Sequence, residues 1–437
     1  MNRLLYNVLL HSVAAPFLAA LYTPQILFGR KYRRSVYGKL GRLPGDFDPE
    51  RLPRPRVWFH AVSVGEVKAL EPLVKALKTF EPDAATLIST GTETGQDTAR
   101  SSISQADGFF YMPLDFPTFV KTVVNTIKPD LFVLMETELW PNLIHHLKKS
   151  GARVVLANGR ISDRSYPRYK KLRWFFTDTL EQVDLFLMVS QLDASRIAAM
   201  GAPETRIQVT GNTKFDAITV QIPGEIEAKI RGMMDFEASA SVLVAGSTHA
   251  GEHEIVLDAY SMLVKRFPDL VLVLVPRHVE KTPYVLSCMK KRGFPSPFLR
   301  SSVDLGEHRD GRRVIIWDRT GELFEVFSIA SVVFMGGSLV PKGGQNILEP
   351  AAWGKVVLFG PSMEDFRDVR EILLRSGGGI EVSGQEELTE RITETLSDPV
   401  RAVDLGARGR DEILRHKGSA TRNAELLFNQ IQATRKG

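Results

Sequence analysis

A glycine-rich stretch in the second half of the chain is the clearest candidate for chemistry. Gly336-Gly337 and Gly343-Gly344 flank a short turn that follows the apolar run Ser331 to Met335. Paired glycines let a backbone approach a ligand, and a helix starting near Asn346 would aim free N–H groups at a bound anion. Glu349, one turn into that helix, suits the neighbouring hydroxyls of a ribose. The pattern indicates a nucleotide site, although a strand-to-helix turn without a ligand fits it as well.

An acidic residue near the end of the first apolar run, Glu66, could accept a proton. The run closes at His60 and a helical pattern opens after Ser63, so Glu66 lies where a strand turns into a helix. A carboxylate in that place suits a general base. The spacing of Ser63 and Glu66 is also that of a capping box, in which both side chains satisfy backbone N–H groups. The sequence leaves both interpretations open.

Charged residues follow other apolar runs. Pro276-Arg277 ends one of them, and a guanidinium there can hold a phosphate or carboxylate through two hydrogen bonds. Glu136 and Glu138 follow the run Leu131 to Met135, where two acids can orient hydroxyls or complement the positive start of a helix. Lys214 is a point cation that suits a phosphate or a sugar carboxylate, or it is a surface lysine.

One further spacing suggests a metal site. His249, Glu252 and His253 form the pattern H-x-x-E-H of inverted zinc peptidases. The two histidines need an uninterrupted helix to reach one face, but they directly follow an apolar run and Gly251 lies between them. We therefore expect no metal here. A helix-capping turn whose hydroxyls bind an anion is the simpler interpretation.

Composition restricts the class of protein. The chain has 437 residues, 43% of them hydrophobic and 24% charged, which is too long for one core and too apolar for disorder. A single cysteine, Cys288, excludes an internal disulfide and fits a reducing compartment. The formal net charge is +5, and no nucleic-acid-binding module is recognisable.

The chain begins with an apolar segment. No formal charge lies between Arg3 and Arg30, and this stretch is long enough to span a bilayer. The basic residues after it outnumber the one before it, which predicts that the following domain lies on the cytoplasmic side: Arg30, Lys31, Arg33, Arg34, Lys39 and Arg42. We expect residues 1–29 to be a membrane anchor. Internal polar and proline residues leave open whether it spans the bilayer or lies in one leaflet.

The rest of the chain alternates between apolar runs and helical patterns in two series, which predicts an α/β fold with two parallel sheets. The linker is expected near residues 217–235, and a charged terminal helix from about Leu405 to Ala433. Parallel sheets bind ligands at the carboxyl ends of their strands, so we expect the chemistry there, between the two domains. The expected strands are 57–60, 86–89, 131–135, 154–157, 185–189 and 207–209, then 242–245, 271–275, 314–317, 332–335 and 356–359.

Taken in order, seven motifs resemble those of the bacterial Kdo transferases. Together they extend over nearly the whole chain, which makes the resemblance specific although each motif alone is weak. One departure is Gly159, where the family leads us to expect alanine. The motifs are His60 to Glu66, Met135 to Asn142, Asn158 to Ser162, Gly211 to Asp216, Ala245 to His249, Pro276 to His278 and Gly336 to Glu349.

The resemblance implies an inverting glycosyltransferase of the GT-B fold, with two Rossmann-like domains. It implies transfer of 3-deoxy-D-manno-octulosonic acid (Kdo) from CMP-Kdo to the lipid A precursor, without metal or cofactor, at the inner membrane. Residues 30–220 would bind the acceptor and residues 221–437, with the terminal helix, the donor. Glu66 would be the general base, with Glu136 and Lys214 as transition-state stabilisers. The residues implied to contact CMP are Pro276, Arg277, Thr320, Gly321, Glu322, Asn346, Ile347, Leu348 and Glu349.

Two alternatives stay open. Another GT-B enzyme, such as a nucleotide-sugar epimerase, would share the fold but needs no lipid acceptor. A zinc peptidase would use His249, Glu252 and His253.

Overall fold

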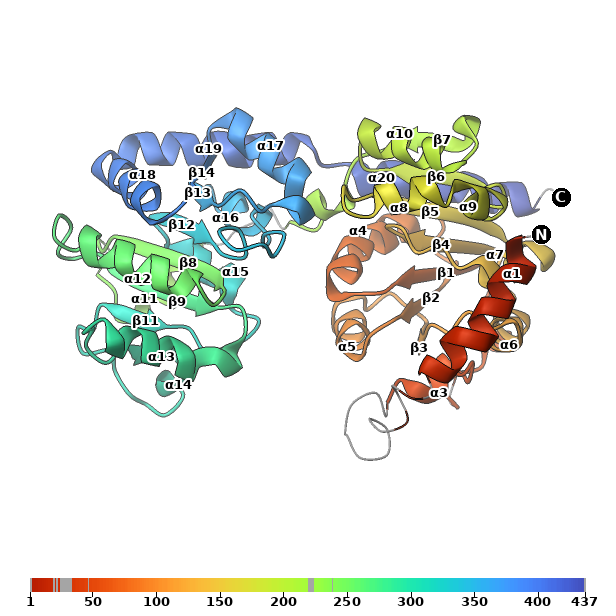
Figure 1. The fold of residues 1–437 in the computed structure, drawn as a ribbon, viewed down its shortest axis with the longest axis horizontal. Helices are drawn as coiled ribbons and strands as arrows, with labels where there is room; N and C mark the ends of the chain where they lie inside the picture. The colour runs from red at the N-terminus through yellow and green to blue at the C-terminus, as the bar shows by residue number, and fades with distance from the viewer. Residues whose placement is uncertain are drawn as a thin grey trace. The chain divides into compact units, whose positions relative to one another are not determined.

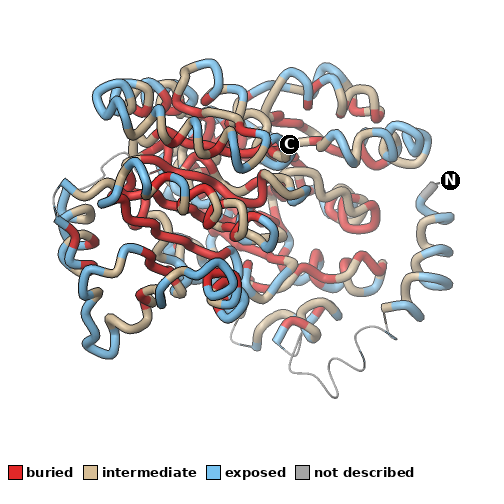
Figure 2. Tube along the Cα trace, turned by 60° about the vertical axis from the view of Figure 1, so that its left-hand side comes forward, coloured by how far each residue is buried: buried red, intermediate tan, exposed pale blue. Residues whose placement is uncertain are grey.

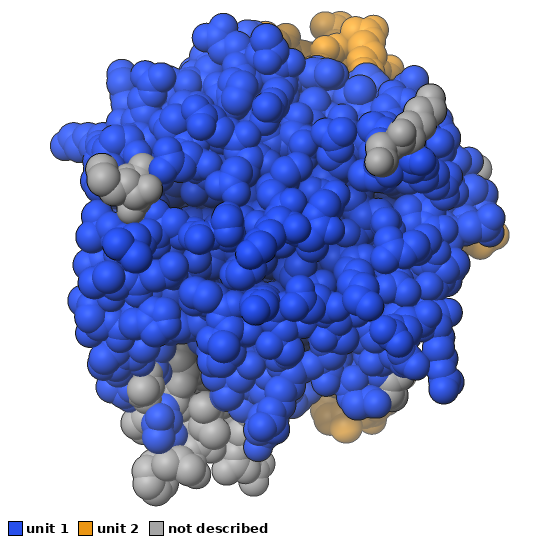
Figure 3. Space-filling view, turned by 90° about the vertical axis from the view of Figure 1, so that its right-hand side faces the viewer, with its two compact units in different colours: residues 1–217, 417–437 blue, residues 218–416 orange. Residues whose placement is uncertain are grey.

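The computed structural model describes residues 2–18, 20, 23, 34–45, 47–218, 224–237 and 239–435. The chain forms two compact units, coloured separately in Figure 3. Unit 1 comprises residues 1–217 and 417–437, and unit 2 comprises residues 218–416. Each unit has its own parallel sheet and its own hydrophobic core.

Unit 1 is built on seven parallel strands in the order β3-β2-β1-β4-β5-β6-β7 (Figure 1). Most of these strands are apolar runs buried on both faces, as expected for a parallel sheet covered by helices on both sides. In sheet order they are β3 (Gly108–Tyr111), β2 (Ala85–Thr90), β1 (Arg56–Ala61), β4 (Leu131–Met135), β5 (Arg153–Gly159), β6 (Leu185–Met188) and β7 (Ile207–Val209).

Helices connect these strands and cover both faces of the sheet. Because successive residues of a strand point to opposite faces, Trp58 packs in one hydrophobic cluster while Val57 and Phe59 pack in the other. Figure 2 shows the buried strands enclosed by partly exposed helices. The helices of unit 1 are α1 (Asn2–Leu9), α3 (Val36–Lys39), α4 (Val64–Phe80), α5 (Glu93–Ser102), α6 (Pro117–Ile127), α7 (Pro141–Lys149), α8 (Tyr166–Lys171), α9 (Arg173–Leu180), α10 (Gln191–Met200) and α20 (Ser419–Arg435).

Unit 2 repeats this plan with the strand order β10-β11-β9-β8-β12-β13-β14. Its strands are β10 (Phe298–Leu299), β11 (Val314–Ile316), β9 (Val271–Pro276), β8 (Val242–Thr248), β12 (Val332–Met335), β13 (Val357–Phe359) and β14 (Gly379–Glu381). Its helices are α11 (Gly224–Met233), α12 (Glu252–Leu263), α13 (Thr282–Lys291), α14 (Arg300–Val303), α15 (Leu323–Val326), α16 (Leu348–Ala352), α17 (Arg367–Ser376), α18 (Gln385–Ser397) and α19 (Pro399–Arg415).

Both sheets reverse their strand order at one point. In unit 1 the chain moves outward from β1 to β2 and β3 and then returns to β4 on the other side of β1. In unit 2 the same reversal separates β8 from β12. Loops leave such a switch point in opposite directions, which opens a crevice at the carboxyl ends of the strands. Glu66 and Glu136 follow β1 and β4, so both lie at the switch point of unit 1.

The structure differs from the sequence-based expectation at the end of the chain. The charged terminal segment is two helices, α19 and α20, separated at Gly418, whose φ is +93°. Helix α20 belongs to unit 1, not to the second domain with which it was grouped, because Ala424, Leu427 and Ile431 are buried in the core of unit 1. The expected linker also differs, since α11 of unit 2 lies within residues 217–235.

Only part of the expected anchor is described, since residues 1, 19, 21, 22 and 24–29 lie outside the described residues. Helix α1 continues into a π-helical turn, Leu10–Ala14. Every helix within the described residues is too short or too polar to cross a bilayer. Helix α1, itself part of unit 1, lies against α7 and α9. There the Asn142 amide donates to Asn7 Oδ1 at 2.6 Å, and the ring of Tyr6 is 5.9 Å from that of Phe175.

Candidate active site

Glu66 is held in one orientation at the start of α4. The Ser63 hydroxyl oxygen accepts the Glu66 backbone N–H at 3.4 Å. The Glu66 carboxylate accepts the Val62 N–H at 2.8 Å and the Ser63 hydroxyl at 3.1 Å. Ser63 therefore caps the helix, as the capping interpretation of the spacing predicted, while the Glu66 carboxylate bonds the N–H of Val62 rather than that of Ser63. The same bonds fix the carboxylate at the carboxyl end of β1, so capping does not exclude a role in chemistry.

The environment of Glu66 favours its protonated form. The residue is 8% exposed. Burial, followed by the negative charge of Glu136, raises the pKa of Glu66 from 4.5 to about 7; Glu138 adds to the rise, while the bonds from Val62 and Ser63 oppose it. Burial and Glu136 raise the pKa of Glu138 as well. A carboxylate that titrates near neutral pH is well matched to proton abstraction under cellular conditions.

Glu136 and Lys214 form an ion pair in unit 1. Lys214 Nζ lies 2.8 Å from Glu136 Oε1, and both side chains are about one-quarter exposed. Glu136 has a φ of +57°, a left-handed backbone conformation that non-glycine residues seldom adopt. Such backbone strain concentrates at functional sites. The structure thus joins motifs from β4 and from the segment after β7.

Asn158 joins β5 to the segment that carries Lys214, and nothing in the sequence singled it out on its own. It is buried at the end of β5 with a φ of +54°, and its Oδ1 accepts the Thr213 N–H at 2.9 Å. The only signal was its place in the motif that contains Gly159. A Cβ at Gly159 would lie 2.3 Å from Leu156 Cδ2 and 2.5 Å from Met188 Sδ, which accounts for glycine with these two neighbours.

In unit 2, the expected phosphate turn is filled by the protein itself. The carboxylate of Glu252, which is fully buried, accepts the N–H groups of Gly337 at 2.7 Å, Ser338 at 3.0 Å and Leu339 at 2.9 Å. The N–H groups of Gly343 and Gly344 are also bonded within the protein, to Ser362 Oγ and to the Gly337 carbonyl. The expectation that these glycines cradle a phosphate is therefore wrong for this structure, because an internal carboxylate takes the place of the anion.

The same carboxylate argues against a zinc site. Glu252 Oε2 also accepts the His249 N–H at 3.0 Å, so both oxygens are engaged with backbone donors. The ring of His253 faces Tyr284, whereas that of His249 faces His278. The described part of the chain contains no group of three or more His, Cys, Asp or Glu residues placed to hold a metal ion.

A cationic region lies at the ends of β8 and β9. Arg277 is exposed after Pro276, and its backbone N–H donates to the Thr248 carbonyl at 3.0 Å. The nearby His249 has a buried Nε2 without a hydrogen-bond partner among the described residues. Burial, followed by the charges of His278, Lys342 and Arg277, lowers the pKa of His249, against the opposing effect of Glu252. This region can bind an anion; the sequence had indicated Arg277 and the turn before His249 for such a site, but not Lys342.

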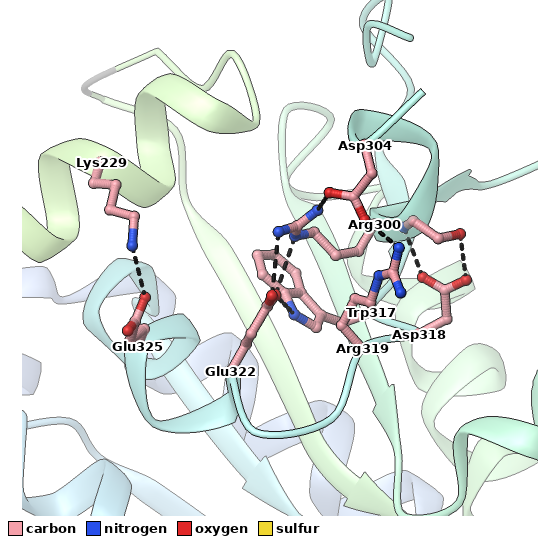
Figure 4. Close-up of polar contacts among 9 residues, drawn as sticks. Lys229, Arg300, Asp304, Trp317, Asp318, Arg319, Glu322 and Glu325 are labelled. Atoms are coloured by element: carbon pink, nitrogen blue, oxygen red, sulfur yellow. Dashed lines mark hydrogen bonds and ion pairs between the residues drawn. The ribbon is translucent and has the colours of Figure 1, made fainter. Parts of the chain in front are cut away.

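The implied CMP contacts differ in what they can offer a ligand. Thr320 and Gly321 are exposed after β11. Figure 4 shows the Glu322 carboxylate pointing at Arg300 and Trp317, which donate to it at 3.1 and 2.8 Å. Glu322 is therefore bound within unit 2 in this structure.

The side chains of the segment from Asn346 to Glu349 are likewise bonded or buried within unit 2. Asn346 Nδ2 donates to Glu349 Oε1 at 3.0 Å, while the side chains of Ile347 and Leu348 are buried in the core. Any ligand contact from Ile347 and Leu348 must come from their backbone. The helix that follows, α16, has only five residues.

Comparisons with known proteins agree with the resemblance. A family model described as 3-deoxy-D-manno-octulosonic-acid transferase (kdotransferase) matches residues 34–217. The 3-deoxy-D-manno-octulosonic acid transferase of Haemophilus influenzae is 33% identical over 392 residues, which is 89% of this chain and 90% of that protein.

Solved structures share the two-unit fold. A glycosyltransferase from Rickettsia africae has a TM-score of 0.61 at 14% identity, over 86% of this chain and 98% of that one. The UDP-GlcNAc 2-epimerase from Neisseria meningitidis has a TM-score of 0.58 at 14% identity, over 86% of this chain and 100% of that one. At such identity these similarities show a GT-B-like fold alone. The sequence relative discriminates between transferase and epimerase, and it shows that the chain belongs to the family of 3-deoxy-D-manno-octulosonic acid transferases.

Proposed function

We propose that this protein transfers Kdo from CMP-Kdo to the tetraacyl disaccharide precursor of lipid A, with inversion at the transferred sugar. The family supports the transferred sugar. The observation that carries the chemical step is the buried Glu66, whose pKa is raised to about 7, at the same sheet switch point as Glu136. No cofactor is required for this chemistry.

In the proposed step, Glu66 takes the proton of the acceptor hydroxyl as that oxygen attacks the anomeric carbon of Kdo. The bond from that carbon to the CMP phosphate oxygen breaks, and CMP leaves as an anion. Inversion requires the base and the leaving group on opposite faces of the sugar. Lys214, oriented by its ion pair with Glu136, supplies a cation that stabilises negative charge in the transition state.

Unit 2 is proposed to bind the donor. The guanidinium of Arg277 suits the CMP phosphate through two hydrogen bonds, and the unpartnered Nε2 of His249 offers a further polar contact beside it. Lys342 adds positive charge to this region. We propose that Thr320, Gly321 and the backbone from Asn346 to Glu349 contact the rest of the nucleotide.

The acceptor is proposed to bind unit 1. A cavity of about 450 Å³ beside β3 is lined by three arginines, Arg34, Arg42 and Arg100. Arg42 lies over the ring of Tyr37 and Arg100 over that of Phe109, which orients both guanidinium groups. Arg34 is oriented by its ion pair with Asp97. A cavity with several cations suits the phosphates of a phosphorylated glycolipid.

A membrane location is proposed from helix α1 and the turn after it. Residues Tyr6 and Asn7 contact α9 and α7, while the opposite face is apolar and exposed: Leu4, Leu5, Val8, Leu9, Val13 and Phe17. Such a helix suits the interface of a bilayer. We propose that it holds the protein on the cytoplasmic face of the inner membrane. Deleting residues 1–29 should then release the protein from membranes in a flotation assay, and continued flotation would contradict this location.

Mass spectrometry of the lipid product tests the transfer reaction. Purified protein incubated with CMP-Kdo and the tetraacyl disaccharide should increase the acceptor mass by one or more Kdo residues and release CMP. The Glu66→Gln variant should bind CMP normally but form little product. An unchanged acceptor with the wild-type protein would refute the proposal, and full product with Glu66→Gln would refute the role of Glu66.

A further inference from the structure

Helix α20, at the end of the chain, contacts both parts of the proposed catalytic apparatus in unit 1. It packs along α4, the helix that carries Glu66, through Ala424, Leu427 and Ile431. Its first turn contacts the short 3-10 helix Thr213–Phe215, which carries Lys214. The chain thus returns, about 200 residues later, to the elements that hold Glu66 and Lys214.

Asp216 joins the Lys214 turn to the start of α20. Its carboxylate accepts the N–H of Gly418 at 2.6 Å and that of Ala420 at 2.9 Å. Hydrogen bonds from the first N–H groups of a helix to a carboxylate are strengthened by the charge and by the helix dipole. Because Asp216 is two residues after Lys214, these two hydrogen bonds fix the C-terminal side of the turn.

Arg422 fixes the N-terminal side of the same turn, which begins at Thr210. Its Nε and Nη2 donate to the Thr210 carbonyl at 3.2 and 3.0 Å, and Nη2 also donates to Ser419 Oγ at 3.1 Å. Gly211, the residue after Thr210, has a φ of +89°, and a Cβ there would lie 2.5 Å from Ser419 Oγ. The close approach of α20 to this segment therefore requires the glycine of the motif.

Lys214 is consequently presented by a segment fixed on several sides. Thr210 and Asp216 are held by α20, Thr213 donates to Asn158, and the Lys214 N–H donates to Asn212 Oδ1 at 2.9 Å. A lysine side chain has many rotamers, and its ion pair with Glu136 depends on where its backbone lies. An attachment that fixes the backbone lowers the entropy lost when the pair forms.

We infer that Asp216 and Arg422 are positioning residues of the transfer reaction, which act through Lys214 by fastening its turn to α20. The inference rests on the proposed role of Lys214. If the turn loosens, Lys214 no longer neutralises Glu136, one of the two carboxylates whose charges act on Glu66. The base then keeps its proton to higher pH. A purely structural attachment would not alter the pH at which Glu66 ionises.

The test compares the two ends of α20. Asp216→Ala and Arg422→Met loosen the end beside Lys214, and Arg422→Lys should partly restore function because its ammonium can still reach the Thr210 carbonyl. Glu81→Gln is the matched control: Glu81 accepts from Arg435 at 3.0 and 3.1 Å, so the substitution weakens the opposite end of the helix. For each protein, kcat and KM for CMP-Kdo are measured across pH, together with thermal unfolding.

Asp216→Ala and Arg422→Met should lower kcat about ten- to a hundredfold, as expected for a misplaced catalytic group. They should also move the acidic limb of the rate profile up by about one pH unit, with little change in KM for the donor. Glu81→Gln should lower the unfolding midpoint and leave the acidic limb in place. If Asp216→Ala does not fold, the two Arg422 variants decide the question.

An unmoved acidic limb in the Asp216 and Arg422 variants, with losses no larger than those of Glu81→Gln, would overturn the inference. Lys214→Met separates this failure from that of the proposed function. If Lys214→Met retains normal kcat, the role of Lys214 itself is wrong. If it loses activity while the Asp216 and Arg422 variants do not, only the positioning by α20 is wrong.

Discussion

Replacing Glu66 by glutamine is expected to stabilise the protein at alkaline pH while it removes activity. The difference between the ordinary pKa of 4.5 and about 7 corresponds to about 3 kcal/mol of free energy that opposes folding once the carboxylate is ionised. The amide keeps the volume of the side chain but loses part of the bonding to Val62 and Ser63, at about 1 kcal/mol. The net stabilisation above pH 7 is therefore about 2 kcal/mol.

The sign of the pH dependence follows from the raised pKa. The protonated acid is the favoured form in the folded state, so its contribution is complete below pH 4.5 and is lost as pH rises through about 7. The midpoint difference between Glu66→Gln and wild type should therefore be small or negative at pH 4.5 and positive at pH 8. At about 2–4 °C per kcal/mol it should reach several degrees in calorimetry.

Glu254→Gln is the matched control with the opposite sign. Burial acts to raise the pKa of Glu254, but hydrogen bonds from Tyr284 and from the N–H of Gly251 outweigh it and lower this pKa. Its contribution to stability is present above the ordinary pKa of 4.5 and is lost as pH falls, so Glu254→Gln should destabilise at pH 8. A Glu66→Gln protein that is less stable than wild type at pH 8, like this control, would refute the account of Glu66.

Three further outcomes follow from the site. Glu252→Gln should destabilise unit 2 by about 2–3 kcal/mol in urea unfolding, because its amide nitrogen would face backbone N–H donors that the carboxylate now accepts. Unaltered stability would contradict the role of Glu252 as an internal anion. Arg277→Lys should weaken CMP binding about tenfold in calorimetry, since a lysine keeps the charge but not the paired donors, and equal affinity would show that Arg277 does not contact the nucleotide. Transfer should persist in EDTA because Arg277 stabilises the leaving phosphate, and a loss restored by a divalent ion would show the opposite.

The long apolar runs were sufficient to predict most of both sheets, but short strands escaped. β10 has two residues and β14 three, and β3 has four residues of alternating burial, so each is too short to stand out in the sequence. The meeting of Glu66 and Glu136 followed from a general rule, because both come after strands of one parallel sheet. That β1 and β4 are neighbours depends on the crossover from β3 to β4, and no single motif encodes this crossover.

Two features depended on partners that are distant in the sequence. The glycine turn has the composition of a phosphate-binding turn, but the carboxylate that fills it belongs to Glu252, which lies 85 residues before Gly337 in the sequence. Likewise, the apolar face of α20 indicates a buried helix without stating which sheet it covers. Its place in unit 1 becomes evident only in the structure, where it packs into the core of unit 1 and where the bonds of Asp216 and Arg422 join segments more than 200 residues apart.

The pH dependence of Kdo transfer tests the central claim most directly, namely that Glu66 is the general base. With CMP-Kdo and the lipid acceptor, kcat/KM for the wild-type protein should fall below an apparent pKa near 7 as Glu66 becomes protonated. In Glu66→Gln the rate should be lower by a factor on the order of 10² to 10⁴, and this limb should be absent. A wild-type rate that stays constant down to pH 5.5, or a Glu66→Gln protein with the same limb, would contradict the assignment.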